Sequence, residues 1–226
     1  MDDSISFEFQ SKNDFEELRQ IIFSFLAVTL LFLFSLISSF IFLPFSKNAK
    51  TKSTSFERFV FIWLLWEALI HIIIEGPFVY MSVMGSVEKS NGIMADMWKE
   101  YGKADSRWLT SDPTIVSVEI PTSIFLGPLS IYVLYLLVTN HPSRHYWQLV
   151  LCICDIYGCW ITFCPEWLTG NQKLHTESFM YFWVYLVFFN GLWVLIPSIL
   201  AYQSWTYIVQ NAKLVQEFEK QNLKVD

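Results

Sequence analysis

Five long apolar stretches, separated by more polar segments, limit the folds that are open to this chain. We predict membrane spans over residues 21–45, 59–84, 114–138, 146–163 and 179–209. A helix needs about 20 apolar residues to cross the hydrocarbon core of a bilayer. Because that core offers no water to backbone amides and carbonyls, a chain crosses it only as helices or as a closed barrel. The pattern therefore predicts an all-α, integral membrane bundle of five transmembrane helices.

Composition agrees with a multi-pass membrane protein. The chain has 226 residues, of which 54% are hydrophobic and 18% aromatic, more than a soluble domain of this size usually carries. A net charge of −6 without a dense basic cluster argues against a nucleic-acid partner. We divide the chain into a polar N-terminal segment (1–20), a membrane domain (21–210) and a charged tail (211–226).

Three of the predicted helices carry polar pairs at membrane depth. A charged side chain in lipid is costly, so such residues usually face an enclosed cavity and are functional. A spacing of three or four residues places both members of a pair on one helix face. We therefore predict one polar intramembrane cavity lined by His71 with Glu75, Glu119 with Thr122, and Asn190 with Trp193.

The same polar residues could instead serve structure, metal binding or hydrolysis. Polar side chains also hold membrane helices together by contacts between helices. A metal site would use His71 with Glu67, Glu75 or Glu119, but the chain has no HExxH or repeated Glu-x-x-His motif, so we expect no metal. A serine hydrolase is disfavoured because no GxSxG motif occurs.

Two further features bear on the cavity. Pro121 lies within the third span, beside Glu119, and should kink that helix because proline has no amide hydrogen. Residues 85–113 form a polar segment in which aromatic and charged residues alternate. We predict that this segment contains an amphipathic lid at the membrane surface.

Several separated motifs resemble the emopamil-binding protein family, whose shared region is called the EXPERA domain. The resemblance covers about residues 59–205, and its motifs are HIIIEG (71–76), WKEYGKADSR (98–107), VEIPT (118–122), Tyr157 with Gly158, and NGLW (190–193). Catalytic members of this family are sterol delta-8 to delta-7 isomerases of the endoplasmic reticulum, and they also bind cationic amphiphilic drugs. The resemblance implies that all six predicted cavity residues occupy functional positions of the family.

Within the family, the chain resembles most the emopamil-binding-protein-like branch. The strings GPFVY (76–80), DPTIVSVE (112–119), PEWLT (165–169) and YGCW (157–160) carry that resemblance. Glu67 and Asp155 depart from the isomerase pattern. They add two carboxyl groups and so change the number of protons that the cavity holds.

We predict a sterol delta-8 to delta-7 isomerase (cholestenol delta-isomerase) that works by proton transfer through a carbocation, without cofactor or metal. The expected catalytic residues are His71, Glu75 and Glu119. The expected substrate-binding residues are Thr122, Asn190 and Trp193, with Trp193 facing the cation and the other two holding the carboxylates by hydrogen bonds.

Two other functions remain open at this point. The first is a binding protein for sterols or cationic amphiphiles without turnover, and the second is a chaperone or assembly partner held in the membrane. The expected partners are a sterol substrate, cationic amphiphilic ligands, the lipid bilayer and a second copy in a homodimer. The expected location is the endoplasmic reticulum membrane, with several passes.

Overall fold

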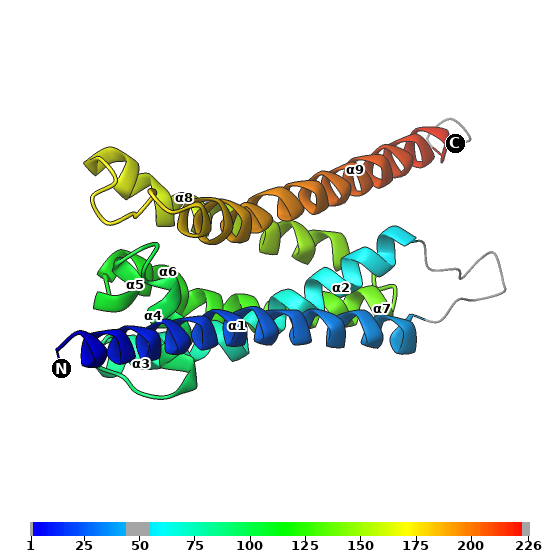
Figure 1. Cartoon of the computed structure of the whole chain (residues 1–226). Coiled ribbons are helices and arrows are strands. Elements are labelled where there is room, and N and C mark those ends of the chain that lie inside the picture. The colour runs from blue at the N-terminus through cyan, green and yellow to red at the C-terminus, as the bar shows by residue number, and fades with distance from the viewer. Residues whose placement is uncertain (1, 44–54, 223–226) are drawn as a thin grey trace.

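The computed structural model describes residues 2–43 and 55–222 (Figure 1). Five of its helical stretches are long and apolar enough to cross a membrane: Leu18–Phe42, Ser55–Met84, Pro113–Val138, Arg144–Thr169 and Met180–Asn222. The prediction of an all-α membrane bundle with five transmembrane helices is confirmed.

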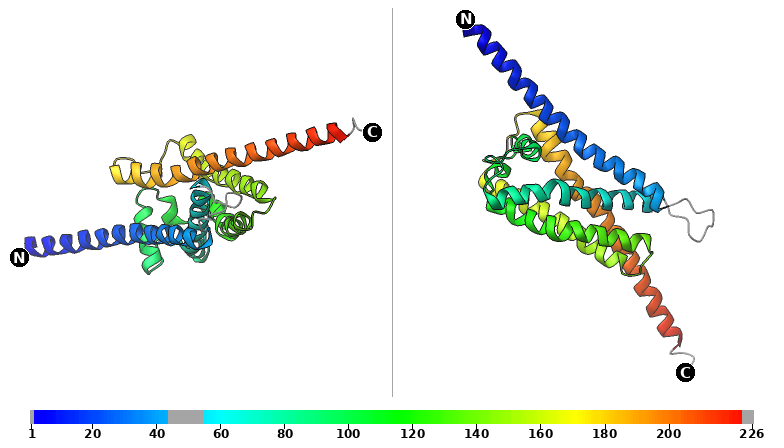
Figure 2. Two further views of the ribbon diagram at one scale, coloured as in Figure 1. Left: turned by 90° about the vertical axis from the view of Figure 1, so that its right-hand side faces the viewer. Right: turned by 90° about the horizontal axis from the view of Figure 1, so that it is seen from below.

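The first and last helices extend beyond the bundle in opposite directions (Figure 2). These are α1 (Asp2–Phe42) and α9 (Asn190–Asn222). Both are continuous, so no break in the chain marks the segment boundaries expected after residues 20 and 210. The helix of the first span ends at Phe42, whereas the prediction extended this span to Phe45. Phe45 lies outside the described residues, and so do residue 1 and residues 223–226 of the expected end segments.

Three spans contain a π-helical segment. The second span consists of α2 (Ser55–Leu69), η1 (Ile70–Glu75) and α3 (Gly76–Met84), and the third of α6 (Pro113–Pro121), η2 (Thr122–Leu126) and α7 (Gly127–Val138). The fifth begins with η3 (Met180–Phe189) and continues into α9. In the third span, η2 follows directly on Pro121, where the sequence predicts a kink. Proline cannot donate the regular helical hydrogen bond, and a wider turn accommodates that loss.

The segment between the second and third spans folds against one end of the bundle. It contains α4 (Ile93–Tyr101) and α5 (Arg107–Thr110). The indoles of Trp98 and Trp108 stack with their centroids 4.7 Å apart, and Phe78 of α3 packs on both. The aromatic side chains of this segment, called the lid below, therefore pack into the protein core. Its position at the membrane surface stays a prediction.

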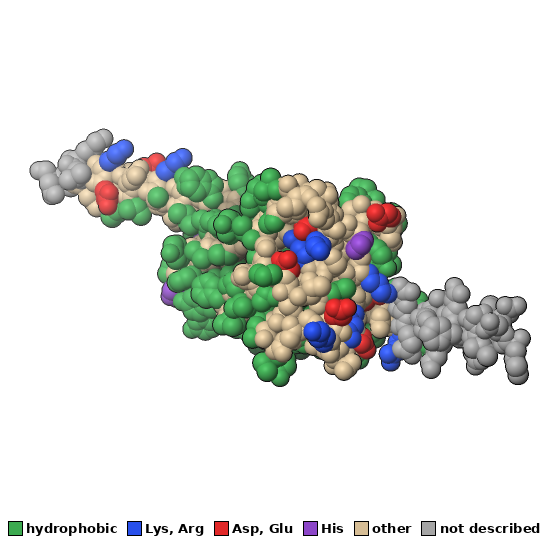
Figure 3. All heavy atoms as spheres, turned by 90° about the vertical axis from the view of Figure 1, so that its left-hand side faces the viewer, with side chains coloured by type: hydrophobic (Ala, Val, Ile, Leu, Met, Phe, Trp, Pro, Cys, Tyr) green, Lys and Arg blue, Asp and Glu red, His purple; other side chains and the backbone are tan. Residues whose placement is uncertain are grey.

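The remaining span is α8 (Arg144–Thr169), which is longer at both ends than the predicted 146–163 and packs along α9. Figure 3 views the molecule from the lid end, where charged side chains gather, whereas the adjoining sides are hydrophobic. Only 11% of the residues in the most apolar window of the first span are buried. Most of its surface is therefore available to lipid.

Candidate functional site

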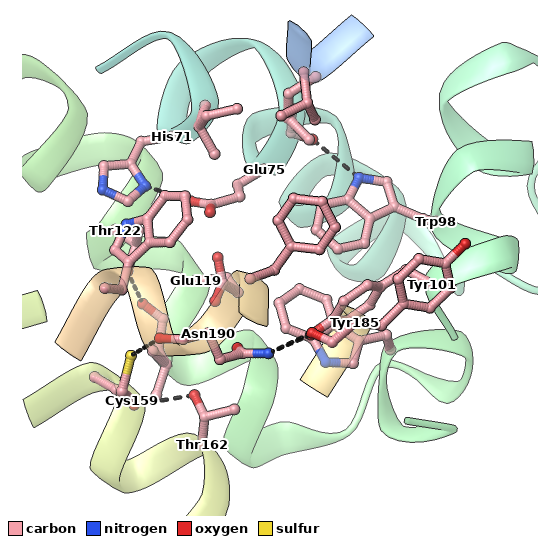
Figure 4. Close-up of a pocket in the computed structure, with 18 of the residues that line it drawn as sticks. His71, Glu75, Trp98, Tyr101, Glu119, Thr122, Cys159, Thr162, Tyr185 and Asn190 are labelled. Carbon is pink, nitrogen blue, oxygen red and sulfur yellow. Dashed lines mark hydrogen bonds and ion pairs between the residues drawn. The ribbon is translucent and has the colours of Figure 1, made fainter. Parts of the chain in front are cut away.

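A cavity lies between the lid and the spans that carry the predicted polar pairs (Figure 4). All six predicted site residues line it: His71, Glu75, Glu119, Thr122, Asn190 and Trp193. The structure thus brings together residues from the second, third and fifth spans. Their roles in binding or catalysis remain predictions.

The polar pairs coincide with the irregular helical segments. His71 and Glu75 belong to η1, Glu119 and Thr122 flank the Pro121 junction between α6 and η2, and Asn190 follows η3. A π-helical turn changes the direction of side chains relative to a regular helix and often occurs at functional sites. Three spans therefore depart from α-helical geometry where they reach this cavity.

His71 and Glu75 form the closest polar contact of the site. Nδ1 of His71 lies 2.6 Å from Oε2 of Glu75. The histidine is 1% exposed and the Glu75 side chain 14% exposed. The carboxyl group fixes the orientation of the imidazole ring, and the pair can move a proton along the bond that joins them.

Glu119 approaches the same point from the third span. It is 7% exposed, it interacts electrostatically with Glu75 and His71, and Figure 4 shows its carboxyl group facing the cavity near Glu75. Its Oε2 is buried without a hydrogen-bond partner in the described part of the chain. Two carboxyl groups from different spans can therefore address one ligand.

The prediction that Asn190 and Thr122 form hydrogen bonds to the carboxylates is wrong. Nδ2 of Asn190 lies 3.0 Å from the hydroxyl of Tyr101 and 2.9 Å from the carbonyl oxygen of Tyr185. The Thr122 hydroxyl donates to the carbonyl of Val118 at 2.8 Å. Both side chains instead bind backbone carbonyls of their own spans: Asn190 binds the backbone of η3, and Thr122 binds the turn before Pro121.

Trp193 belongs to an aromatic cluster beside the cavity. Its ring centroid lies 5.4 Å from that of Trp63, 5.3 Å from Trp66 and 6.2 Å from His71. Its indole nitrogen is buried without a hydrogen-bond partner among the described residues. The cluster provides π faces beside the cavity that both acids line, an arrangement that attracts cations.

The lid contributes a cavity residue that the sequence analysis did not assign. Tyr101 of α4 accepts the hydrogen bond from Asn190, 89 residues away along the chain. Burial raises the pKa of the Tyr101 phenol, so the group stays neutral and keeps its hydrogen for donation. The aromatic spacing of the lid indicates its inner face, but no local pattern reveals a partner in a distant helix.

The lid is attached to the membrane helices by buried polar contacts. The indole of Trp98 donates to the carbonyl of Ile74 in η1 at 3.0 Å, which satisfies a carbonyl of the π-helical segment. Arg107 donates to the carbonyl of Thr162 in α8 at 2.6 Å and pairs with Asp105. These contacts hold α4 and α5 over the cavity.

Comparison with known proteins identifies the family. A protein of Oryza sativa subsp. japonica named probable 3-beta-hydroxysteroid-Delta(8),Delta(7)-isomerase is 36% identical over 152 residues, which are 67% of this chain and 68% of that protein. The family model EXPERA (EXPanded EBP superfamily) matches residues 93–204. The chain belongs to the EXPERA family.

Other members are similar over comparable lengths. The 3-beta-hydroxysteroid-Delta(8),Delta(7)-isomerase of Cavia porcellus is 34% identical over 162 residues, 70% of this chain and 69% of the isomerase. An isomeliandiol synthase of Melia azedarach is 32% identical over 178 residues, 79% of this chain and 80% of the synthase. The family prediction is confirmed, and the names of these relatives support an enzyme. The assignment to one branch of the family stays a prediction.

Proposed function

We propose that this EXPERA protein is a sterol delta-8 to delta-7 isomerase. Several relatives carry that name, and the cavity supports the proposal by its chemistry. The carrying observation is that Glu75 and Glu119, on different spans, face one largely apolar cavity beside His71. Moving a double bond requires one group that gives a proton and one that takes a proton, and both carboxyl groups reach the same space.

In the proposed reaction, the π electrons of C8=C9 form a new bond to a proton at C9, which leaves a cation at C8. The C7–H bond then breaks, its electrons form C7=C8, and the proton passes to a base. Glu75 and Glu119 exchange these protons, and His71 holds Glu75 through the 2.6 Å contact. The composition of the sterol is unchanged, so no oxidant or reductant is consumed.

Stabilisation of the carbocation is the main task of the site. A carboxylate about 4 Å from a cation contributes on the order of 4 kcal/mol at an effective dielectric constant near 20. The aromatic cluster around Trp193 adds roughly 0.5–2 kcal/mol through its ring face. Fixed charges of this kind act on the transition state because they require no rearrangement during the reaction.

The same features support binding of cationic amphiphiles as a second part of the proposal. A protonated amine on an apolar skeleton places its charge where the carbocation would form. We further propose that the protein is located in the endoplasmic reticulum membrane, as the family resemblance implies. We also propose that it assembles as a homodimer.

Expression in cells that lack their own sterol isomerase tests the enzymatic proposal. We expect delta-8 sterols to be converted to delta-7 sterols, as measured by mass spectrometry of extracted sterols. Glu119→Gln should lower the conversion rate about 100- to 1000-fold. Glu88→Gln, a variant of an exposed acid in the loop before α4, serves as the control. Persistence of delta-8 sterols despite folded, amine-binding protein would refute turnover and leave a binding protein.

A further inference from the structure

A second group of ionisable side chains lies on the other side of the His71 ring. Glu67 of α2 and Asp155 of α8 are 0% and 5% exposed, and His71 between them and Glu75 is 1% exposed. Figure 4 shows the second ring nitrogen of His71 on the side away from Glu75. Glu67 and Asp155 have no role in the isomerisation proposed above.

The distances within this group are too long for hydrogen bonds to the histidine. Nε2 of His71 lies 3.8 Å from Oε1 of Glu67 and 4.0 Å from Oδ1 of Asp155. One ligand atom from each of the three residues lies within 4.8 Å of the other two. Hydrogen bonds between nitrogen and oxygen span about 2.7–3.2 Å.

Several polar atoms of the group have no other partner. Both carboxyl oxygens of Glu67, Nε2 of His71 and Oδ2 of Asp155 are buried without a hydrogen-bond partner in residues 2–43 and 55–222. Unsatisfied polar atoms in a membrane interior are costly. Their convergence on one point is an arrangement that a bound cation would satisfy.

The donor atoms specify what that occupant should be. Carboxyl oxygens of two acids and one imidazole nitrogen are donors that a divalent transition-metal ion accepts. Buried charges in proteins are paired or coordinate metals, and neither Glu67 nor Asp155 forms an ion pair with Lys or Arg among the described residues. Three protein ligands with a fourth position open to water are a common arrangement for zinc.

We propose that Glu67, His71 and Asp155 form a binding site for one divalent transition-metal ion, with zinc as the ion that best fits the donors. Zinc accepts imidazole nitrogen and carboxylate oxygen at about 2.0–2.2 Å, which places neighbouring tetrahedral ligands about 3.4 Å apart. The observed 3.8 and 4.0 Å approach this spacing.

The contact between His71 and Glu75 supports the proposal independently. Histidines that bind a metal through one ring nitrogen almost always donate the other N–H to a carboxylate or carbonyl. Here Nδ1 makes that contact with Glu75 at 2.6 Å, and Nε2 faces Glu67 and Asp155. A metal on Nε2 would fix the hydrogen on Nδ1 and would thereby couple the metal site to the acid in the cavity.

The test measures metal content directly and requires no substrate. The full chain is purified in detergent without a metal-binding tag, washed with a chelator, and analysed by elemental mass spectrometry. We expect about one zinc ion per chain in the wild type and a loss to background in Glu67→Gln. Glu88→Gln provides the matched control, because it removes an exposed carboxylate and should keep the metal.

A second readout keeps the proposal testable if Glu67→Gln does not fold. Wild-type protein stripped of metal under denaturing conditions and refolded is titrated with Co²⁺, and we expect the visible absorption bands of a four-coordinate ion. Glu67→Asp, which keeps a carboxylate, should bind Co²⁺ more tightly than Asp155→Asn. Native wild type without zinc or another transition metal, together with no Co²⁺ bands, would overturn the proposal. Equal zinc content in the wild type and a folded Glu67→Gln would overturn it as well.

Discussion

Replacement of Arg107 by methionine should destabilise the protein strongly, because this arginine joins the lid to α8. Its Nε and Nη2 lie 2.9 Å and 2.6 Å from the carboxyl oxygens of Asp105, and its Nη1 donates to the carbonyl of Thr162 at 2.6 Å. The arginine is 2% exposed and Asp105 is 1% exposed. Arg107→Met keeps most of the side-chain volume but leaves the buried carboxylate of Asp105 without its cation.

The expected size follows from that geometry. Removing one partner of a buried ion pair costs about 3–5 kcal/mol of stability. In a chain of this length, 1 kcal/mol shifts the melting temperature by about 2–4 °C, so the melting temperature should fall by roughly 6–20 °C. Burial alone would lower the pKa of the Arg107 guanidinium, but the hydrogen bonds and charge of Asp105, with the charge of Glu166, outweigh it and raise the pKa. The guanidinium of Arg107 therefore stays charged over the pH range of any practical assay.

Thermal unfolding in detergent, combined with a double-mutant cycle, measures this effect. Asp105→Asn, Arg107→Met and the double variant should give a coupling energy of about 2–3 kcal/mol, near the upper end for residues in direct contact. Lys89→Met, which replaces an exposed base in the same segment, is the control and should change the melting temperature little. An Arg107→Met variant as stable as Lys89→Met, or a coupling near zero, would refute the idea that this buried ion pair stabilises the protein.

Two further predictions concern packing and ligand binding. A Cβ at Gly127 would lie 2.8 Å from Cγ1 of Ile72 and 3.3 Å from Cβ of His71, so Gly127→Ala should lower the unfolding free energy by about 1–3 kcal/mol. Gly191 has open space around it, so Gly191→Ala should be neutral or slightly stabilising in thermal unfolding. Equal effects of the two variants would contradict the close packing at η1. Glu119→Gln should weaken binding of a lipophilic amine at least tenfold, as measured by radioligand competition, because it removes a counter-charge from a dry site. Phe34 is exposed on the first span, so Phe34→Leu should leave the affinity unchanged. Equal affinities of these two variants would place the amine elsewhere.

The fold and the residues that line the cavity could be predicted from the sequence, because both depend on local signals. Apolar length identifies the five spans, and a polar residue at membrane depth is rare enough to mark a buried site. His71, Glu75 and Glu119 could therefore be assigned to one cavity without knowledge of the helix packing.

The details of the contacts could not be predicted in the same way. Asn190 was expected to hold a carboxylate, yet it binds Tyr101 of the lid and the backbone of η3. Its choice depends on the position of the η3 carbonyls and of Tyr101, and sequence patterns do not reveal either. The proximity of Glu67 to Asp155 likewise depends on how α2 packs relative to α8.

Turnover of a delta-8 sterol by the purified protein in deuterated water tests the central claim most directly. The proton added at C9 comes from a cavity acid that exchanges with solvent, so the delta-7 product should carry one deuterium at C9, as read by mass spectrometry and NMR. Glu75→Gln and Glu119→Gln should each slow the appearance of this product about 100-fold or more. A delta-7 product without deuterium at C9, or undiminished rates in both variants, would contradict proton transfer by these two acids.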